Sequence, residues 1–325
     1  MSADFRTMAG RLGYRPDIGA IVGALLVLAA FSAVDPSGWW SFFTLKNVTQ
    51  YTAILGFLVL GQTLVIMTGE IDLSVGSVYG LTAIAFIFFA GRSSVPVAFV
   101  GAMAVAGLAG LFNSLMVVRL GLVSMVVTMS TLFIGRGVIY VWTGGSADSL
   151  SQADRVYWLT KTLGGSWLWF KNGFFVYLLI VGACQLMLAR ARLGNHIMAA
   201  GGDAVSAHSR GVDVARTKAT AFLLSALLAG LSGIVTICDQ PQTHVTLGES
   251  MEMESIAAAV LGGALLAGGR GSAIGAALGA FIITAVRYEL IGLGAPSSWY
   301  ISFVGLVLVV AVIANQRIGT ALRGL

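Results

Sequence analysis

Long apolar runs, separated by short polar segments, set the pattern of this chain. A helix needs about 17 to 25 residues to cross the hydrocarbon core of a bilayer, and ten runs reach or approach that length. The pattern therefore predicts an all-α, polytopic membrane protein with about ten transmembrane helices, at residues 18–34, 51–68, 75–90, 95–118, 122–142, 174–188, 219–238, 251–267, 272–291 and 299–314.

Composition supports this class. Apolar residues make up 57% of the chain and charged residues 10%, with a mean hydropathy of +0.90. An ordinary soluble domain has roughly 45–50% apolar and about 25% charged residues, so a soluble fold is excluded. The net charge of +5 comes from basic residues at the ends of apolar runs, which favours membrane lipid as the surroundings and no nucleic-acid partner. Cys184 and Cys238 lie in or beside apolar runs and are predicted to be core thiols.

Charge and tryptophan positions predict one orientation. An even number of spans places both termini on one side, and if Arg6, Arg11 and Arg15 are cytoplasmic, most other basic residues are cytoplasmic too. All seven tryptophans then fall at or beyond the outer boundary. We predict a cytoplasmic segment 1–17, a transmembrane domain 18–315 and a cytoplasmic tail 316–325. The first run also fits a signal peptide, but nine further runs favour a retained signal anchor.

Two long polar segments interrupt the apolar pattern. Residues 190–218 are rich in basic side chains and are predicted to be a cytoplasmic loop on which a soluble partner can dock. Residues 143–173 are rich in Gly and Ser with aromatic interruptions, and the predicted orientation places them outside the membrane on the non-cytoplasmic side. This outer segment is either a surface for a soluble partner or a plain connecting loop, because loops of this length are often but not always functional.

The sequence Gly-Glu-Ile-Asp-Leu-Ser-Val-Gly-Ser at 69–77 joins the second and third spans. An acidic residue at a helix centre in lipid costs about 2.5–3.5 kcal/mol, so Glu70 and Asp72 must face water, protein or an interface. In one interpretation Asp72 caps the third helix, while Ser74 and Ser77 satisfy free backbone donors. In the other, a broken helix junction lines or gates a path through the membrane.

Further polar residues fall within the predicted spans. They either line a polar path or form hydrogen bonds between helices, since each needs a partner away from lipid. Arg136 carries a permanent charge and requires a partner, for which Glu289 is a candidate. The residues of this set are Gln62, Asn113, Thr128, Ser130, Thr131 and Arg136.

Four ordered motifs carry a resemblance to a known family. The first is Gly-x-Ile-Asp-Leu-Ser-x-Gly at 69–76, preceded by Leu-Gly-Gln-Thr-Leu-Val-Ile at 60–66. Together with three more, this motif resembles the permease subunits of ribose-type ATP-binding-cassette (ABC) importers from residue 51 onward. The other three motifs lie at 128–145, 194–212 and 252–272.

The resemblance implies a coupling helix that docks on an ATPase. The glycine frame of the family's cytoplasmic loop is present at Gly194, Gly201, Gly202 and Gly211. The chain departs from the family at Asp203, where Asn is usual, and at 206–210, which ends in Arg210. Because of these differences from the family, the sequence leaves open which ATPase docks on this loop.

The function implied by the resemblance is ATP-driven import of a small sugar or polyol across a bacterial inner membrane. The implied partners are ABC ATPase subunits, a periplasmic or lipoprotein solute-binding protein, and a second permease copy in a homodimer or heterodimer. The chain has no Gly-x-x-x-x-Gly-Lys-Ser/Thr motif for binding ATP phosphates. We therefore expect that it is not an enzyme and holds no cofactor or metal, and that its partner subunits bind the ATP. The alternatives are an ABC permease for branched-chain amino acids or nucleosides, an ion-coupled secondary transporter, and a membrane enzyme.

Overall fold

The computed structural model describes residues 17–323. Residues 1–16 and 324–325 lie outside the described part of the chain, and with them Arg6, Arg11 and Arg15, on which the predicted orientation depends.

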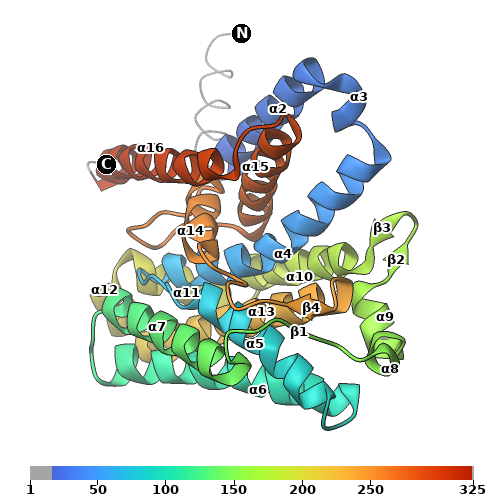
Figure 1. The fold of residues 1–325 in the computed structure, drawn as a ribbon. Helices are drawn as coiled ribbons and strands as arrows, with labels where there is room; N and C mark the ends of the chain where they lie inside the picture. The colour runs from blue at the N-terminus through green and yellow to red at the C-terminus, as the bar shows by residue number, and fades with distance from the viewer. Residues whose placement is uncertain (1–16, 324–325) are drawn as a thin grey trace.

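The described chain is almost entirely helical (Figure 1). The longer helices are α2 (Asp17–Val34), α4 (Phe42–Met67), α5 (Val75–Ala90), α6 (Val95–Ser114), α7 (Ser124–Thr143), α10 (Asn172–Arg190), α11 (Arg192–Gly202), α13 (Val214–Asp239), α14 (Met251–Leu261), α15 (Ala273–Gly292) and α16 (Ser297–Arg323). Short elements are α3 (Pro36–Trp39), α8 (Gln152–Arg155), α9 (Trp158–Gly164), α12 (Ala204–Ser209), a π-helical turn η1 (Leu115–Arg119), and the strands β1 (Asp148–Ser149), β2 (Ser166–Trp167), β3 (Phe170–Lys171) and β4 (Gln242–Thr243).

Seven of the described helices are long and apolar enough to cross a membrane: α2, α4, α6 with η1, α7, α10, α13 and α15. The predicted helical class is confirmed, but the predicted number of about ten spans is not, because α5 and the apolar part of α16, residues 298–310, are shorter. α14 has 11 residues and ends where Gly262 and Gly263 follow, and Gly263 has a left-handed φ of 88°. The predicted helix 251–267 is wrong in its second half. α16 continues to Arg323, so residues 316–323 of the predicted tail are helical.

Helix α4 lies at the centre of the bundle, since 94% of its apolar window is buried, compared with 17% for α10. α13 packs on α4 together with α5 and α6, while α15, α14 and α2 form a second group that α4 joins to the first (Figure 1). The helices approach closely: a Cβ on Gly61 of α4 would lie 2.7 Å from the Cα of Ser225 on α13. Small residues allow such contacts where lipid supplies no hydrophobic drive.

The second long polar segment, residues 143–173, is structured. It contains α8, α9 and the antiparallel β2–β3 pair, and its β1 strand pairs antiparallel with β4, with Asp148 opposite Thr243. Beside this pair, the N–H of the buried Leu150 donates to the carbonyl of Pro241 at 3.1 Å. Residues 143–173 are thus joined to the connection between α13 and α14.

Candidate functional site

The chain is not helical between α4 and α5, at residues 68–74; Gly69 is exposed, whereas residues 72–74 are buried in the bundle. Gly69 adopts a φ of 84°, which turns the chain after α4. Buried backbone groups outside a helix need other partners. Here α7 supplies them: the N–H of Leu73 donates to Thr128 Oγ1 at 3.0 Å, and the N–H of Ile71 donates to Ser124 Oγ at 3.3 Å.

A buried hydrogen-bond network holds the end of the break next to α5. Asp72 Oδ1 accepts from the N–H and Oγ of Ser74 at 2.9 and 2.6 Å, and Asp72 Oδ2 accepts from Ser225 Oγ of α13 at 3.1 Å. Asn113 Nδ2 of α6 donates to Ser74 Oγ at 2.8 Å, and Thr131 Oγ1 of α7 donates to Asn113 Oδ1 at 2.6 Å. We call these five residues the Asp72 network. It joins the start of α5 to three other helices.

Asp72 lies two residues before the N-cap position of α5, which Ser74 occupies. Its carboxylate binds the N–H of Ser74, the residue that precedes α5, and the Ser74 side chain makes no cap hydrogen bond to the helix. Ser77 Oγ donates to the carbonyl of Ser74 at 2.9 Å. The capping interpretation is therefore wrong for Ser74 and Ser77, whose hydroxyls satisfy no free N–H of the helix, and Asp72 binds the N–H of the residue that precedes the helix.

The remaining predicted path residues lie apart from this network. Glu70 Oε1 pairs with Lys218 Nζ of α13 at 2.5 Å. Gln62 is buried in α4, and its side-chain amide has no hydrogen-bond partner among the described residues. Arg136 donates to the carbonyl of Leu247 at 2.8 Å, so its predicted pairing with Glu289 is replaced by a contact with the connection between α13 and α14.

A second irregular segment, residues 240–250, meets the first at the start of α5. A Cβ on Gly76 in the first turn of α5 would lie 2.6 Å from the carbonyl oxygen of Gly248, and it would also overlap the Glu252 carboxylate in the first turn of α14. Gly248 itself has a φ of 85°. The N-terminal ends of α5 and α14 therefore adjoin within the bundle, where free N–H groups and the helix dipoles favour negative or acceptor groups.

The predicted coupling loop folds as α11 and α12, and its glycines have distinct roles. A Cβ on Gly194 would lie 2.5 Å from the Cα of Leu188, and a Cβ on Gly201 would overlap the carbonyl oxygen of Met67 at the end of α4. No atom lies within 4 Å of a Cβ on Gly202, whereas Gly211 has a φ of 84°. The glycine frame therefore packs α11 against α10 and against the last residue before the break.

Asp203 separates α11 from α12 and caps α12. Its carboxylate accepts from the N–H groups of Val205 and Ser206 at 3.0 and 3.1 Å, and from Ser206 Oγ at 2.6 Å. These hydrogen bonds, with a smaller contribution from the charge of Arg210, lower the pKa of Asp203 below its ordinary value of 3.8. Asp and Asn are comparable helix caps, so the departure from the family at this position keeps the local structure.

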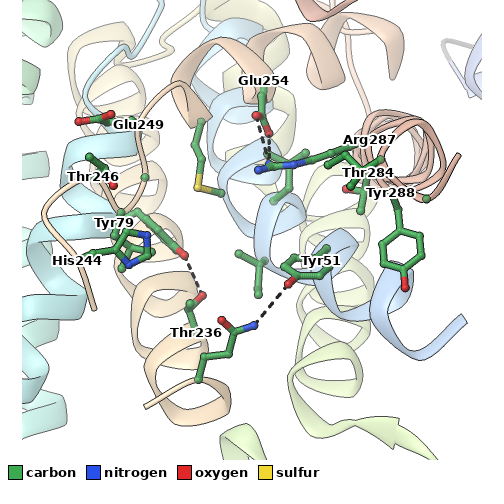
Figure 2. Close-up of a pocket in the computed structure, with 18 residues that line it drawn as sticks. Tyr51, Tyr79, Thr236, His244, Thr246, Glu249, Glu254, Thr284, Arg287 and Tyr288 are labelled. Atoms are coloured by element: carbon green, nitrogen blue, oxygen red, sulfur yellow. Dashed lines mark hydrogen bonds and ion pairs between the residues drawn. The ribbon is translucent and has the colours of Figure 1, made fainter. Parts of the chain in front are cut away.

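A cavity of about 610 Å³ opens beside the Gly76–Gly248 contact. Its walls come from α4, α5, α13, α14 and α15 and from the 240–250 segment (Figure 2). Tyr79 Oη donates to Thr236 Oγ1 at 3.0 Å in this wall, and Arg287 pairs with Glu254 at 3.4 Å.

A smaller cavity of about 520 Å³ lies at the other end of the break, against Gly69, Glu70, Ile71 and Lys218. Along the chain, the Asp72 network comes between Ile71 of this cavity and Tyr79 of the larger one.

Comparison with known proteins identifies the family. The family model for the permease component of branched-chain amino acid transport systems matches residues 44–312. The chain belongs to this family.

Relatives support the same class of protein. The permease is 35% identical over 308 residues to an autoinducer 2 import system permease protein of Enterobacter sp. strain 638, which covers 94% of this chain and 88% of the relative. It is 34% identical over 315 residues to a probable ABC transporter permease of Sinorhizobium fredii, with 96% and 92% covered. The autoinducer 2 permease of Escherichia coli K12 is 32% identical over 322 residues, with 94% and 89% covered. No solved structure gives a significant match.

The resemblance to ribose-type ABC permeases is confirmed, and the chain is a permease subunit of an ABC importer. Of the predicted path residues, the permease brings Asp72, Ser74, Asn113 and Thr128 together around the break. Sequence reasoning missed the lining of the larger cavity, because Tyr and Gln near the ends of spans resemble ordinary interfacial residues. His244 lies there too, in a segment that the sequence marks only as a connection.

Proposed function

We propose that the permease forms the path by which a small hydroxylated solute, a sugar or polyol, is imported at the expense of ATP hydrolysed by separate subunits. The autoinducer 2 import named for its relatives supports this solute class. The observation that carries the mechanism is the contact of Gly201 on α11 with the Met67 carbonyl at the end of α4. This contact would pass movement of a docked ATPase directly to the break.

The next contacts continue from the break toward the larger cavity. The Glu70–Lys218 pair ties the start of the break to α13, and the Asp72 network ties its end to α6, α7 and α13. The Gly76–Gly248 contact then joins α5 to the 240–250 segment. Because packed contacts of this kind have discrete arrangements, a shift of α11 would change which end of the path is open.

The proposal includes the partners expected from the sequence. ABC ATPase subunits would dock on α11 and α12 and bind the ATP, a solute-binding protein would deliver solute to the outer segment 143–173, and a second permease copy would complete the assembly. The permease would lie in the inner membrane with both termini cytoplasmic. Seven helices of the described residues are long and apolar enough to cross a membrane, which supports the membrane location.

Reconstitution tests this function. We expect proteoliposomes that contain the permease, its ATPase and its binding protein to accumulate radiolabelled D-ribose or autoinducer 2 against a gradient when ATP is present. L-leucine is the comparison solute, because the family model is described by branched-chain amino acid transport. Uphill uptake without the ATPase, or uptake of leucine alone, would contradict the proposal.

A further inference from the structure

The larger cavity has the size and position of a solute site. Pockets for small ligands have volumes of roughly 300–1,000 Å³, and this cavity has about 610 Å³. It lies beside the adjoining N-terminal ends of α5 and α14, where the helical backbone is interrupted. Interrupted helices inside a membrane bundle are tolerated where they line a cavity, and transporters place binding sites at such interruptions.

Most polar groups around the cavity are uncharged. Tyr51, Tyr79 and Tyr288 contribute hydroxyl groups from three different helices, and Gln240 contributes a side-chain amide (Figure 2). The hydrogen bond from Gln240 Nε2 to Tyr51 Oη is 3.5 Å long, at the upper limit for such a bond. A solute hydroxyl can replace this weak bond with two shorter ones.

Two charged groups of the cavity, Arg287 and Glu254, are already engaged with each other. Arg287 Nη1 lies 3.4 Å from both carboxylate oxygens of Glu254. Among the described lining residues Arg287 is the one permanent cation, while Glu249 adds a second carboxylate. An anionic solute would lack a free cation, and a zwitterionic amino acid would have to break the existing pair. The charge pattern favours an uncharged solute.

Apolar side chains complete the wall. Ile54 and Leu55 of α4, Met251 of α14 and Ile291 of α15 line the same space. A solute that presents hydroxyl groups on one face and C–H groups on another therefore finds both kinds of partner. An ion would find the apolar part of this wall unfavourable.

We propose that this cavity is the site in the permease that holds the uncharged, hydroxylated solute during import, with Tyr51 and Gln240 among its hydrogen-bonding partners. This inference rests on the proposed function and gives it a location. It places the solute away from the Asp72 network, whose polar groups are used within the protein.

Cysteine protection tests the location in the full transporter. In a permease with Cys184→Ser and Cys238→Ala, Thr246→Cys places a thiol in the cavity, and Thr162→Cys places one on the exposed surface of α9 as a matched control. We expect D-ribose or autoinducer 2, at roughly ten times its dissociation constant, to slow maleimide labelling of Thr246→Cys about tenfold. Labelling of Thr162→Cys should not change.

A conservative pair of variants tests the hydrogen bonding. Tyr51 and Tyr140 are 43% and 47% exposed, but only Tyr51 lines the cavity. Tyr51→Phe should lower the amount of solute imported per ATP hydrolysed roughly three- to tenfold, because one hydrogen bond is lost. Tyr140→Phe, outside the cavity, should change neither the import per ATP nor the basal ATPase activity.

The possible results of these experiments distinguish an error in the proposed solute site from an error in the proposed function. ATP-driven uptake of ribose or autoinducer 2 without protection of Thr246→Cys would overturn the site and leave the proposed function intact. Protection by L-leucine alone would overturn the solute class. Absence of uptake for every hydroxylated probe would overturn the proposed function as well.

Discussion

Gly201 packs against the carbonyl group of Met67 with no room for a side chain between them. The same oxygen accepts the N–H of Gly269 at 2.9 Å, so it is held from two sides. The neighbouring Gly202 has no atom within 4 Å of a Cβ position. The two adjacent glycines therefore differ: there is room for a side chain at Gly202 but not at Gly201.

Gly201→Ala should lower the free energy of unfolding by about 1–3 kcal/mol, because the added methyl group displaces the end of α4. ATP-driven uptake should fall with it. Gly202→Ala should change stability by less than about 0.5 kcal/mol. Thermal unfolding in detergent and uptake in proteoliposomes measure the two effects, and equal behaviour of the two variants would refute the packing argument.

Asp72→Ala should be among the more damaging single changes in the break. It leaves the Ser74 and Ser225 hydroxyls and the Ser74 N–H without their acceptor, and each unsatisfied buried group costs about 1–3 kcal/mol. Asp72→Asn, which keeps one oxygen and the shape, should be milder. Ser130→Ala is the control, since the Ser130 hydroxyl is exposed and bonds the carbonyl of Val126 in its own helix. The argument fails if unfolding by denaturant does not separate Asp72→Ala from this control.

A double variant that exchanges the charges of Glu70 and Lys218 should restore the uptake that each single charge reversal removes. The side chains are 16% and 23% exposed, so a coupling free energy of about 1 kcal/mol is expected from a double-mutant cycle. Glu70→Lys and Lys218→Glu should each reduce uptake, and the double variant should recover most of it. A cycle without coupling would show that the two residues act independently.

Ser206→Ala should raise the pKa of Asp203 toward 3.8, because the Ser206 hydroxyl is the first cause of its lowering. A carboxylate with a lowered folded-state pKa stabilises the fold above its unfolded value and loses that contribution as the pH falls through the folded value. The cap on α12 should therefore be complete above about pH 4 and weaken below it. Carbon-13 NMR of the Asp203 carboxyl measures the shift, with Ser209→Ala as control; an unchanged pKa would contradict the assigned cause.

Hydropathy predicted where the helices lie but not every helix end. The start and end of α5 match the prediction because Ser74 and Gly91 flank its apolar run. α14 stops at Leu261, although Ala264 to Ala267 continue the apolar composition, because consecutive glycines end the helix at 262–263. Hydropathy measures transfer to lipid and carries no information on backbone conformation.

The residues of the break were predictable, and their partners were not. Asp72, Ser74 and Asn113 stand out as polar residues in apolar runs. Their pairing, however, joins residues 39 and 153 positions apart, between Asn113 and Ser74 and between Ser225 and Asp72. Such contacts depend on how helices pack, which a single sequence does not encode locally. The cavity residues Tyr51 and Gln240 were missed for the same reason.

The β1–β4 pair has a consequence for the 240–250 segment, which lines the larger cavity. Each strand has two residues, and isolated pairs of strands are only marginally stable in water. The strand pair therefore contributes little to holding the 240–250 segment, which is also held by the Arg136–Leu247 hydrogen bond and the Gly76–Gly248 contact. A protein that bound residues 143–151 would therefore separate the two strands without a large rearrangement of the helices.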